Sequence, residues 1–372
     1  MRNQILPQQG RTRRCLTLEA WPEADRTAWQ LANQAGDVLA PGGAAAGWAP
    51  STRAGASAAY GRWLAYLAAA QRLDPAIGPA DRVTPDAIGQ YVADLQAKHA
   101  ATSVAAYLAF LVCALRAMAP ECDWRWLQGI VARLKQAATP ARNKRPQIVP
   151  TSALFSFGLE LMAEAEQSPE ITGWQQAIDF RDGLMIALLA ARPLRRRNFC
   201  AIEIGKHLLR QREGYWLHFE AAETKTQQPL ELPFPTQLVP ALERYLSHYR
   251  PWLLRCTGHR NGAYPFHAPG QRLWVSKTGS AMSEEVFYKG LRKRTTAQFG
   301  HSVNPHLFRD CAATSIAIED PEHVTISRSL LGHATLRTSE RYYTHAHSLE
   351  ASRRYQGRVL ALRQQTAGRG RT

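Results

Sequence analysis

Apolar side chains recur at helical spacing in three consecutive stretches of segment 51–138. In each stretch they occupy positions i, i+3, i+4 and i+7, which fall on one face of an α-helix: Tyr60, Trp63, Leu64 and Leu67; Ile88, Tyr91, Val92 and Leu95; and Val104, Tyr107, Leu108 and Leu111. Thr84 and Pro85 indicate a helix start, because threonine caps the first turn and proline fits its first position. A one-sided apolar helix must bury that side, so we predict a domain of three or four packed helices.

The pattern changes after Pro150 to a mixture of helices and short strands. From the periodicity we predict helices over 153–166, 175–191, 237–249, 283–298 and 306–318. Polar turns separate three short runs that we predict to be strands: 204–209, 215–220 and 230–233. The expected fold is mainly α with a small antiparallel β-sheet, in which a helical N-terminal domain precedes an α+β domain.

Two stretches have the composition of linkers. Glycine and small residues fill 41–48 and favour flexibility. Two prolines bracket the basic run 139–146, where a continuous helix is disfavoured. We therefore predict five parts: an N-terminal arm and linker, 1–50; a helical domain, 51–138; a basic linker, 139–150; a second domain, 151–348; and a C-terminal tail, 349–372, that docks either on a neighbouring subunit or on its own domain.

The chain carries a formal net charge of +16. Lys and Arg gain Coulomb energy and release counterions on a phosphate backbone, so this charge favours a nucleic-acid partner over an acidic membrane surface. The candidate phosphate contacts are Arg53 and Arg62 on the predicted helices, and Arg142, Lys144 and Arg145 in the basic linker. Taken one at a time, the helix residues are better explained as a solvated surface.

Cysteine usage and hydropathy favour a cytoplasmic protein. The six cysteines include no Cys-x-x-Cys pair, so neither a disulfide framework nor a zinc ribbon is indicated. No apolar run approaches the roughly 20 residues that cross a bilayer. We expect a reduced, cytoplasmic protein with no membrane partner.

Residues that carry chemistry follow one another in a fixed order through the second half. Arg195 comes just after the apolar helix 175–191, and His306 and Arg309 share a helix face at i and i+3. His333 follows in a Leu-Gly-His sequence, and Tyr342 comes nine residues later. Each motif alone is usually structural, and their succession is what indicates a function.

Cleaving a phosphodiester without a metal requires a nucleophile, positive charge at the non-bridging oxygens, and a proton for the departing 5′ oxygen. Each of these demands has a candidate among the ordered residues. Because tyrosine titrates near 10 in water, it needs a proton acceptor or nearby positive charge that stabilises its phenolate. Arg195, His306 and Arg309 are the candidates for that charge, since a guanidinium fork suits a phosphate.

The ordered set resembles the sequence boxes of the tyrosine recombinase, or phage integrase, family. Pro193-Leu194-Arg195 is similar to that family's Gly-Leu-Arg, with proline in place of glycine, and Asn198 stands where the family usually has Glu or Asp. Lys225 lies in the turn between the second and third strands, where the family places a lysine as general acid. The resemblance implies six catalytic residues, with Tyr342 as the nucleophile: Arg195, Lys225, His306, Arg309, His333 and Tyr342.

The resemblance covers about 150–347, and more weakly 51–138, which looks like the family's SAM-like core-binding domain. It implies a site-specific recombinase that cleaves and rejoins DNA strands through a 3′-phosphotyrosyl intermediate, without cofactor or metal, in the service of a mobile element. It also implies a homotetramer on two synapsed duplex sites. Any accessory DNA-bending or directionality factor stays open.

Alternatives remain for several residues and for the function. The residue alternatives are Arg196 or Arg197 for Arg195, Lys206 for Lys225, and Tyr343 for Tyr342. His333, His345 and His347 could begin a zinc site, but no carboxylate or cysteine is placed to complete it. The chain could also be a catalytically silent DNA-binding protein of the same fold or a type IB topoisomerase, although the N-terminal helical module and the Leu-Gly-His box fit a recombinase better.

Overall fold

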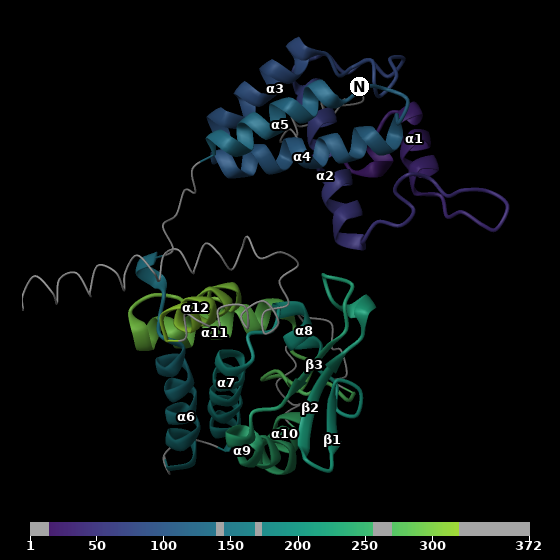
Figure 1. Ribbon diagram of the computed structural model, residues 1–372. Helices are drawn as coiled ribbons and strands as arrows, with labels where there is room; N and C mark the ends of the chain where they lie inside the picture. The colour runs from purple at the N-terminus through teal and green to yellow at the C-terminus, as the bar shows by residue number, and fades with distance from the viewer. Residues whose placement is uncertain (1–14, 139–144, 168–172, 256–269, 320–372) are drawn as a thin grey trace, which may run out of the picture. The chain divides into compact units, whose positions relative to one another are not determined.

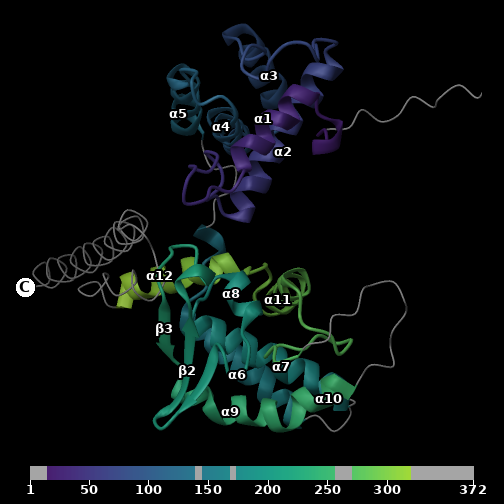
Figure 2. The same ribbon diagram turned by 90° about the vertical axis from the view of Figure 1, so that its right-hand side faces the viewer.

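The computed structural model describes residues 15–138, 145–167, 173–255 and 270–319. The chain divides into two compact units, Met1–Asn143 and Lys144–Thr372 (Figures 1 and 2). Their division falls inside the stretch 139–150 that we expected to be a linker. Helices predominate among the described residues, beside one three-stranded antiparallel sheet. The predicted fold class is therefore confirmed.

The first unit is a helical bundle in which α4 contacts every other helix (Figure 1). Its elements are η1 (Leu18–Ala20), α1 (Glu23–Asn33), α2 (Pro50–Ala69), α3 (Pro85–Lys98), α4 (Ala101–Met118) and α5 (Arg125–Ala137). The Thr84 hydroxyl caps α3 as predicted, accepting a 3.2 Å hydrogen bond from the Ala87 N–H. Among the described helices, α4 alone is apolar and long enough to cross a membrane by composition. Its packing inside the bundle accounts for that apolarity.

The segment before α2, which we expected to be an arm and linker, contributes to the core of this unit. Trp21 and Trp29 are buried in the same cluster as Tyr60 of α2. The glycine-rich stretch folds back on α1, where the Ala45 N–H donates to the Ala32 carbonyl at 2.7 Å. A side chain at Gly43 would meet the Leu31 carbonyl oxygen at 2.1 Å. Glycine is thus required there for close approach of the backbone as well as for flexibility.

A buried ion pair fastens α1 to the rest of the unit. Arg82 Nη1 lies 2.6 Å from Asp25 Oδ1, and both side chains are almost fully buried. The Tyr60 hydroxyl donates a hydrogen bond to the same carboxylate oxygen. Burial, with the negative charge of Asp25 beside it, raises the pKa of Tyr60 well above its usual range. Three segments far apart in sequence therefore meet at one carboxylate.

The second unit places a small sheet beside a group of helices (Figure 2). The helices are α6 (Thr151–Gln167), α7 (Gly173–Ala191), α8 (Arg196–Ala201), α9 (Val239–Arg244), α10 (Arg250–Arg255), α11 (Glu284–Phe299) and α12 (Pro305–Glu319). The strands β1 (Leu208–Gln211), β2 (Gly214–Phe219) and β3 (Leu230–Pro233) pair in the order β1-β2-β3, with Leu217 of β2 opposite Leu208 and Leu232.

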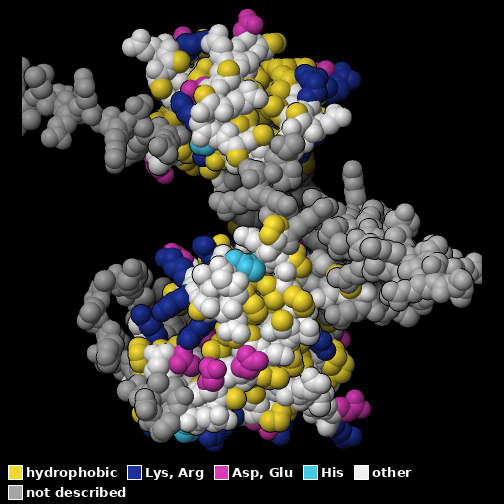
Figure 3. Space-filling model, turned by 90° about the vertical axis from the view of Figure 1, so that its left-hand side faces the viewer, with side chains coloured by type: hydrophobic (Ala, Val, Ile, Leu, Met, Phe, Trp, Pro, Cys, Tyr) yellow, Lys and Arg dark blue, Asp and Glu magenta, His cyan; other side chains and the backbone are white. Residues whose placement is uncertain are grey.

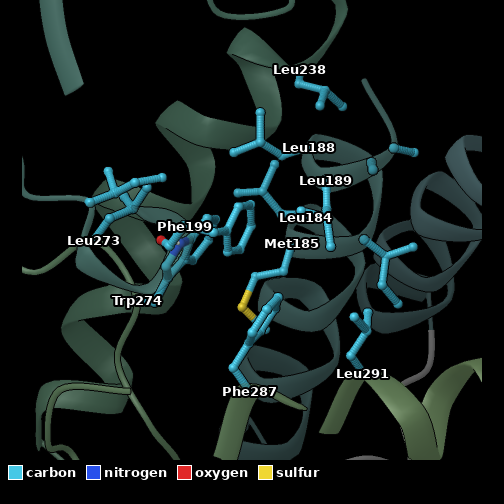
Figure 4. Packing of buried hydrophobic residues seen from close by; sticks show 14 of the residues in the cluster. Leu184, Met185, Leu188, Leu189, Phe199, Leu238, Leu273, Trp274, Phe287 and Leu291 are labelled. Atoms are coloured by element: carbon cyan, nitrogen blue, oxygen red, sulfur yellow. Dashed lines mark hydrogen bonds between the residues drawn. The ribbon is translucent and has the colours of Figure 1, made fainter. Parts of the chain in front are cut away.

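The core of this unit surrounds α7, which is buried along nearly its whole length. Helices α6 and α7 cross at Gly158 and Gly183, where an added Cβ would lie 2.6 Å from the backbone of the opposite helix. Phe199 of α8 stacks on Trp274 and on Phe287 of α11, with ring centroids 5.2 and 5.0 Å apart (Figure 4). This aromatic stack fixes α8, the helix that follows Arg195, against the core.

Two predicted elements differ from the structure. The first strand begins at Leu208 instead of 204, because Gly205 adopts a left-handed φ of +82° and the chain turns there. The helix predicted over 237–249 continues to Arg255, through a π-helical turn, Tyr245–Tyr249, that separates α9 from α10. The remaining predicted elements among the described residues agree in type, with bounds shifted by one or two residues.

Candidate active site

Arg195 occupies the position just before α8. Its neighbour Leu194 is 3% exposed and anchors the turn in the core, while Arg195 itself is half-buried. Burial lowers the pKa of its guanidinium from the usual value, but arginine stays charged in proteins. A half-buried, permanently charged guanidinium at a fixed turn is suited to binding a phosphate.

Arg309 joins α12 to the turn that carries Arg195. Its side chain is buried, and its Nη1 donates a hydrogen bond of 2.5 Å to the Pro193 carbonyl. The two arginines, 114 positions apart in sequence, are therefore held at one place by a bond between α12 and the backbone two residues before Arg195. The replacement of the family's glycine by Pro193 leaves this contact intact, because proline keeps its carbonyl acceptor.

His306 lies in the first turn of α12, one helical turn before Arg309. The Asn304 side chain caps this end by accepting 3.0 Å hydrogen bonds from the N–H groups of His306 and Leu307. His306 is exposed, whereas Leu307 and Phe308 are buried and fix the helix against the core. The predicted His-x-x-Arg spacing thus gives one accessible imidazole above one buried guanidinium.

Lys225 is exposed on the turn between β2 and β3, just after a short 3-10 helix, Ala221–Glu223. Asn198 of α8 is buried, and its Nδ2 donates to the Glu223 carbonyl at 3.2 Å. Helix α8 therefore connects the Arg195 turn at its start with the Lys225 turn. Thr224 closes the turn, donating to the Gln228 carbonyl at 2.7 Å.

Two of the alternative residues have ion-pair partners in the structure. Arg196 is exposed and pairs with Glu284 of α11 at 2.7 Å, and Arg197 is also exposed. Lys206 pairs with Glu223 at 2.6 Å, a contact that raises the pKa of the lysine. An ammonium that holds its proton more tightly is a poorer general acid. The choice of Arg195 and Lys225 over their neighbours stays a prediction.

Some predicted residues lie outside the described part of the chain. These are His333, Tyr342, Tyr343, His345 and His347, together with Arg142 and Lys144 of the basic linker. Arg145 begins a 3-10 helix, Arg145–Gln147. The described residues contain no group of three potential metal-ligating side chains. The assignments of Tyr342 and His333 stay predictions.

The two predicted DNA contacts of the first unit already have partners within the protein. Arg53 Nη2 donates to the carbonyls of Ala45 and Ala46, at 3.4 and 3.1 Å. The Arg62 guanidinium lies over the Tyr107 ring, 3.9 Å from its centroid. Both side chains are half-buried. Arg53 is thus used to hold the glycine-rich turn, and its role in binding DNA stays a prediction.

A basic helix face was missed by the sequence reasoning. Helix α11 buries Phe287, Leu291 and Thr295 and exposes Lys289, Arg292 and Lys293. Lys and Arg side chains gather on one side of this unit in Figure 3. The face could be predicted from the sequence, because Phe287 and Leu291 lie four positions apart and leave Lys289, Arg292 and Lys293 on the opposite side.

The sequence profile of the phage integrase family matches residues 159–350. Among solved structures, the chain is similar to the XerH site-specific recombinase bound to its difH substrate before cleavage, with 17% identity and a TM-score of 0.50 over 81% of this chain and 78% of that one. It is similar also to XerH bound to a palindromic difH substrate after cleavage, with 16% identity and a TM-score of 0.51 over 79% and 78%. No protein of curated function matches significantly.

Proposed function

The chain belongs to the phage integrase family of tyrosine recombinases, and we propose that it cleaves and rejoins duplex DNA through a 3′-phosphotyrosyl intermediate formed by Tyr342. The family supports site-specific recombination as the general activity. We further propose that the recombination serves the movement of a mobile element.

One observation carries the proposal: α8 links three separate parts of the chain at one site. The turn before α8 bears Arg195 and bonds Arg309 through the Pro193 carbonyl. Asn198 in the same helix bonds the turn that bears Lys225. The Arg309 hydrogen bond is buried and the Asn198 hydrogen bond is partly buried, which favours a built site over a set of charges on a solvated surface.

Each group has a role in the proposed reaction. Tyr342 reacts as its phenolate, after its proton has passed to solvent. Its oxygen attacks the scissile phosphorus and forms a new P–O bond while the bond from phosphorus to the 5′ oxygen breaks. Guanidinium groups of Arg195 and Arg309 stabilise the charge on the non-bridging oxygens. Lys225 transfers a proton from its ammonium to the departing oxygen. The phosphotyrosyl bond conserves the energy of the broken one, so a 5′ hydroxyl can reverse the reaction and rejoin the strands.

We propose duplex DNA as the substrate and a homotetramer on two synapsed sites as the assembly. The basic face of α11, Lys289, Arg292 and Lys293, supports DNA binding, because phosphate contacts provide most non-specific affinity. XerH, in the complexes noted above, is bound to DNA substrates. Direct base contacts would then select the site.

The proposal is tested by trapping the covalent intermediate on DNA. The substrates are duplexes from the flanks of the encoding gene, nicked beside each candidate site so that the cut fragment diffuses away. They are incubated with the protein, and the products are resolved on a denaturing gel. We expect an adduct that is lost in Tyr342→Phe and retained in the matched control Tyr343→Phe. If the adduct is lost only in Tyr343→Phe, the nucleophile is Tyr343.

Two experimental results would each favour a different function. Sequence-specific binding by the native protein without any adduct would indicate a silent DNA-binding member of the family. Relaxation of supercoiled plasmids that contain no such site would indicate a topoisomerase.

A further inference from the structure

Glu223 anchors the start of the turn that carries Lys225. Its carboxylate receives three partners from two segments, Lys206 with His207 and the residue Glu220. Lys206 Nζ lies 2.6 Å from Oε1. His207 Nε2 lies 3.2 Å from both carboxylate oxygens. The Glu220 N–H donates to Oε2 at 3.1 Å. Both oxygens are therefore occupied by groups other than Lys225.

His207 is held as a donor toward this carboxylate. Its side chain is 3% exposed, and its ring packs against Phe219 of β2 with centroids 5.1 Å apart. The ring Nδ1 accepts a hydrogen bond from the Glu203 N–H at 3.1 Å. A neutral imidazole that accepts at Nδ1 carries its proton on Nε2, which is the nitrogen that faces Glu223.

The backbone of Glu223 completes the anchorage. Its carbonyl accepts the hydrogen bond from Asn198 of α8, and the Glu220 side chain and the Glu223 backbone form the other half of a capping box. The surrounding donors hold the pKa of the Glu223 carboxyl at about 2, with the Lys206 contact as the largest cause. The charge that attracts these partners is thus present throughout the physiological pH range.

We propose that Glu223 positions Lys225: its carboxylate and its carbonyl fix the turn that presents the lysine ammonium to the departing 5′ oxygen. Lys225 comes two residues after Glu223, with buried Thr224 between them. Because Lys206 and His207 occupy the carboxylate, the turn is fixed without an ion pair that would hold Lys225 away from DNA. The inference rests on the proposed function, in which Lys225 donates the proton.

The test compares two DNA duplexes that differ in one atom. In the first the scissile phosphate has its natural bridging 5′ oxygen, and in the second sulfur replaces that oxygen. A thiol titrates near 8.5, so its thiolate leaves without receiving a proton. A variant whose defect is the delivery of that proton is therefore slow on the oxygen duplex and normal on the sulfur duplex.

Glu223→Gln keeps the size of the side chain and removes its charge. We expect its single-turnover cleavage of the oxygen duplex to fall by about 10- to 100-fold, part of what general-acid catalysis contributes. On the sulfur duplex its rate should stay within about 2-fold of the native rate, and Lys225→Ala should show the same pattern, since both lose the same proton transfer. Glu223→Asp, which keeps the charge on a shorter stem, should lie between.

Glu231→Gln is the matched control. It removes the same charge from the same hairpin, but Glu231 is exposed and bonds His218 at 2.9 Å. Equal losses on both duplexes for Glu223→Gln, or no loss on either, would overturn the inference. If a lowered melting temperature shows that Glu223→Gln misfolds, the rates of Glu223→Asp on the oxygen and sulfur duplexes test the inference instead. A native protein that forms no adduct with either duplex would instead remove the proposed function itself.

Discussion

Truncating Asp25 should strongly destabilise the first unit, because it leaves a guanidinium buried without its counter-charge. Arg82 and the Tyr60 hydroxyl both bond Asp25, and the Asp25 and Arg82 side chains are 0% and 2% exposed. Removing one partner of a buried pair costs about 3–5 kcal/mol. A unit of this size has a free energy of unfolding of about 5–15 kcal/mol. The loss in Asp25→Ala is thus a large share of the total.

Asp123→Ala is the control for this prediction. Asp123 pairs with Arg125 at 2.7 Å, but the two side chains are 58% and 87% exposed, so losing this surface pair should cost far less than losing the buried one. The free energy of unfolding is measured by chemical denaturation, with hydrogen exchange of peptides from α1 to α5 as the readout specific to this unit.

A second variant separates the charge from the packing. Replacing the whole polar cluster, by Asp25→Leu with Arg82→Met and Tyr60→Phe, leaves no charge or hydroxyl without a partner there. Apolar replacement of a buried ion pair is often neutral or stabilising, so this variant should be more stable than Asp25→Ala. A cost below about 1 kcal/mol for Asp25→Ala, or a triple variant less stable than the single one, would refute the reasoning.

Three further predictions concern the second unit. Arg309→Ala should slow single-turnover cleavage by about 100- to 1000-fold, because it removes a charge that stabilises the transition state; a near-native rate would contradict its role. Replacing Lys289, Arg292 and Lys293 with Ala should flatten the dependence of log DNA affinity on log salt by about 0.9 for each phosphate that the variant no longer neutralises; an unchanged slope would take α11 out of the interface. The folded pKa of the Glu223 carboxyl, about 2, is below the unfolded value near 4.3, so its contribution to stability is complete above the unfolded value and is lost as pH falls toward 2. Acid-unfolding curves of the native protein and Glu223→Gln should therefore converge at low pH. A constant separation between the curves would show that ionisation of Glu223 does not stabilise the fold.

Local pattern was sufficient to predict most of the elements. The strand 230–233 and the helix cap at Thr84 follow from residue types within a few positions. The first strand was placed too early, because nothing in its apolar pattern shows that Gly205 turns the chain. The stretch 41–48 has a linker's composition, yet it folds back on α1, since glycine permits close approach as well as flexibility.

The site was predictable as a set of residues but not as an arrangement. The order of Arg195, Lys225, His306 and Arg309 came from sequence boxes. Their connections depend on hydrogen bonds between residues far apart in the chain, such as Asn198 with Glu223. The periodicity of a single helix or strand cannot show that two residues so far apart in sequence contact each other. His333 and Tyr342 lie outside the described residues and stay predictions.

The bond between Arg309 and the Pro193 carbonyl joins residues 116 positions apart, and this separation has a consequence during synthesis. A ribosome delivers the first arginine and the lysine well before it delivers α12. A growing chain would therefore lack the bond that joins α12 to the turn before α8 until the later helix has emerged and docked.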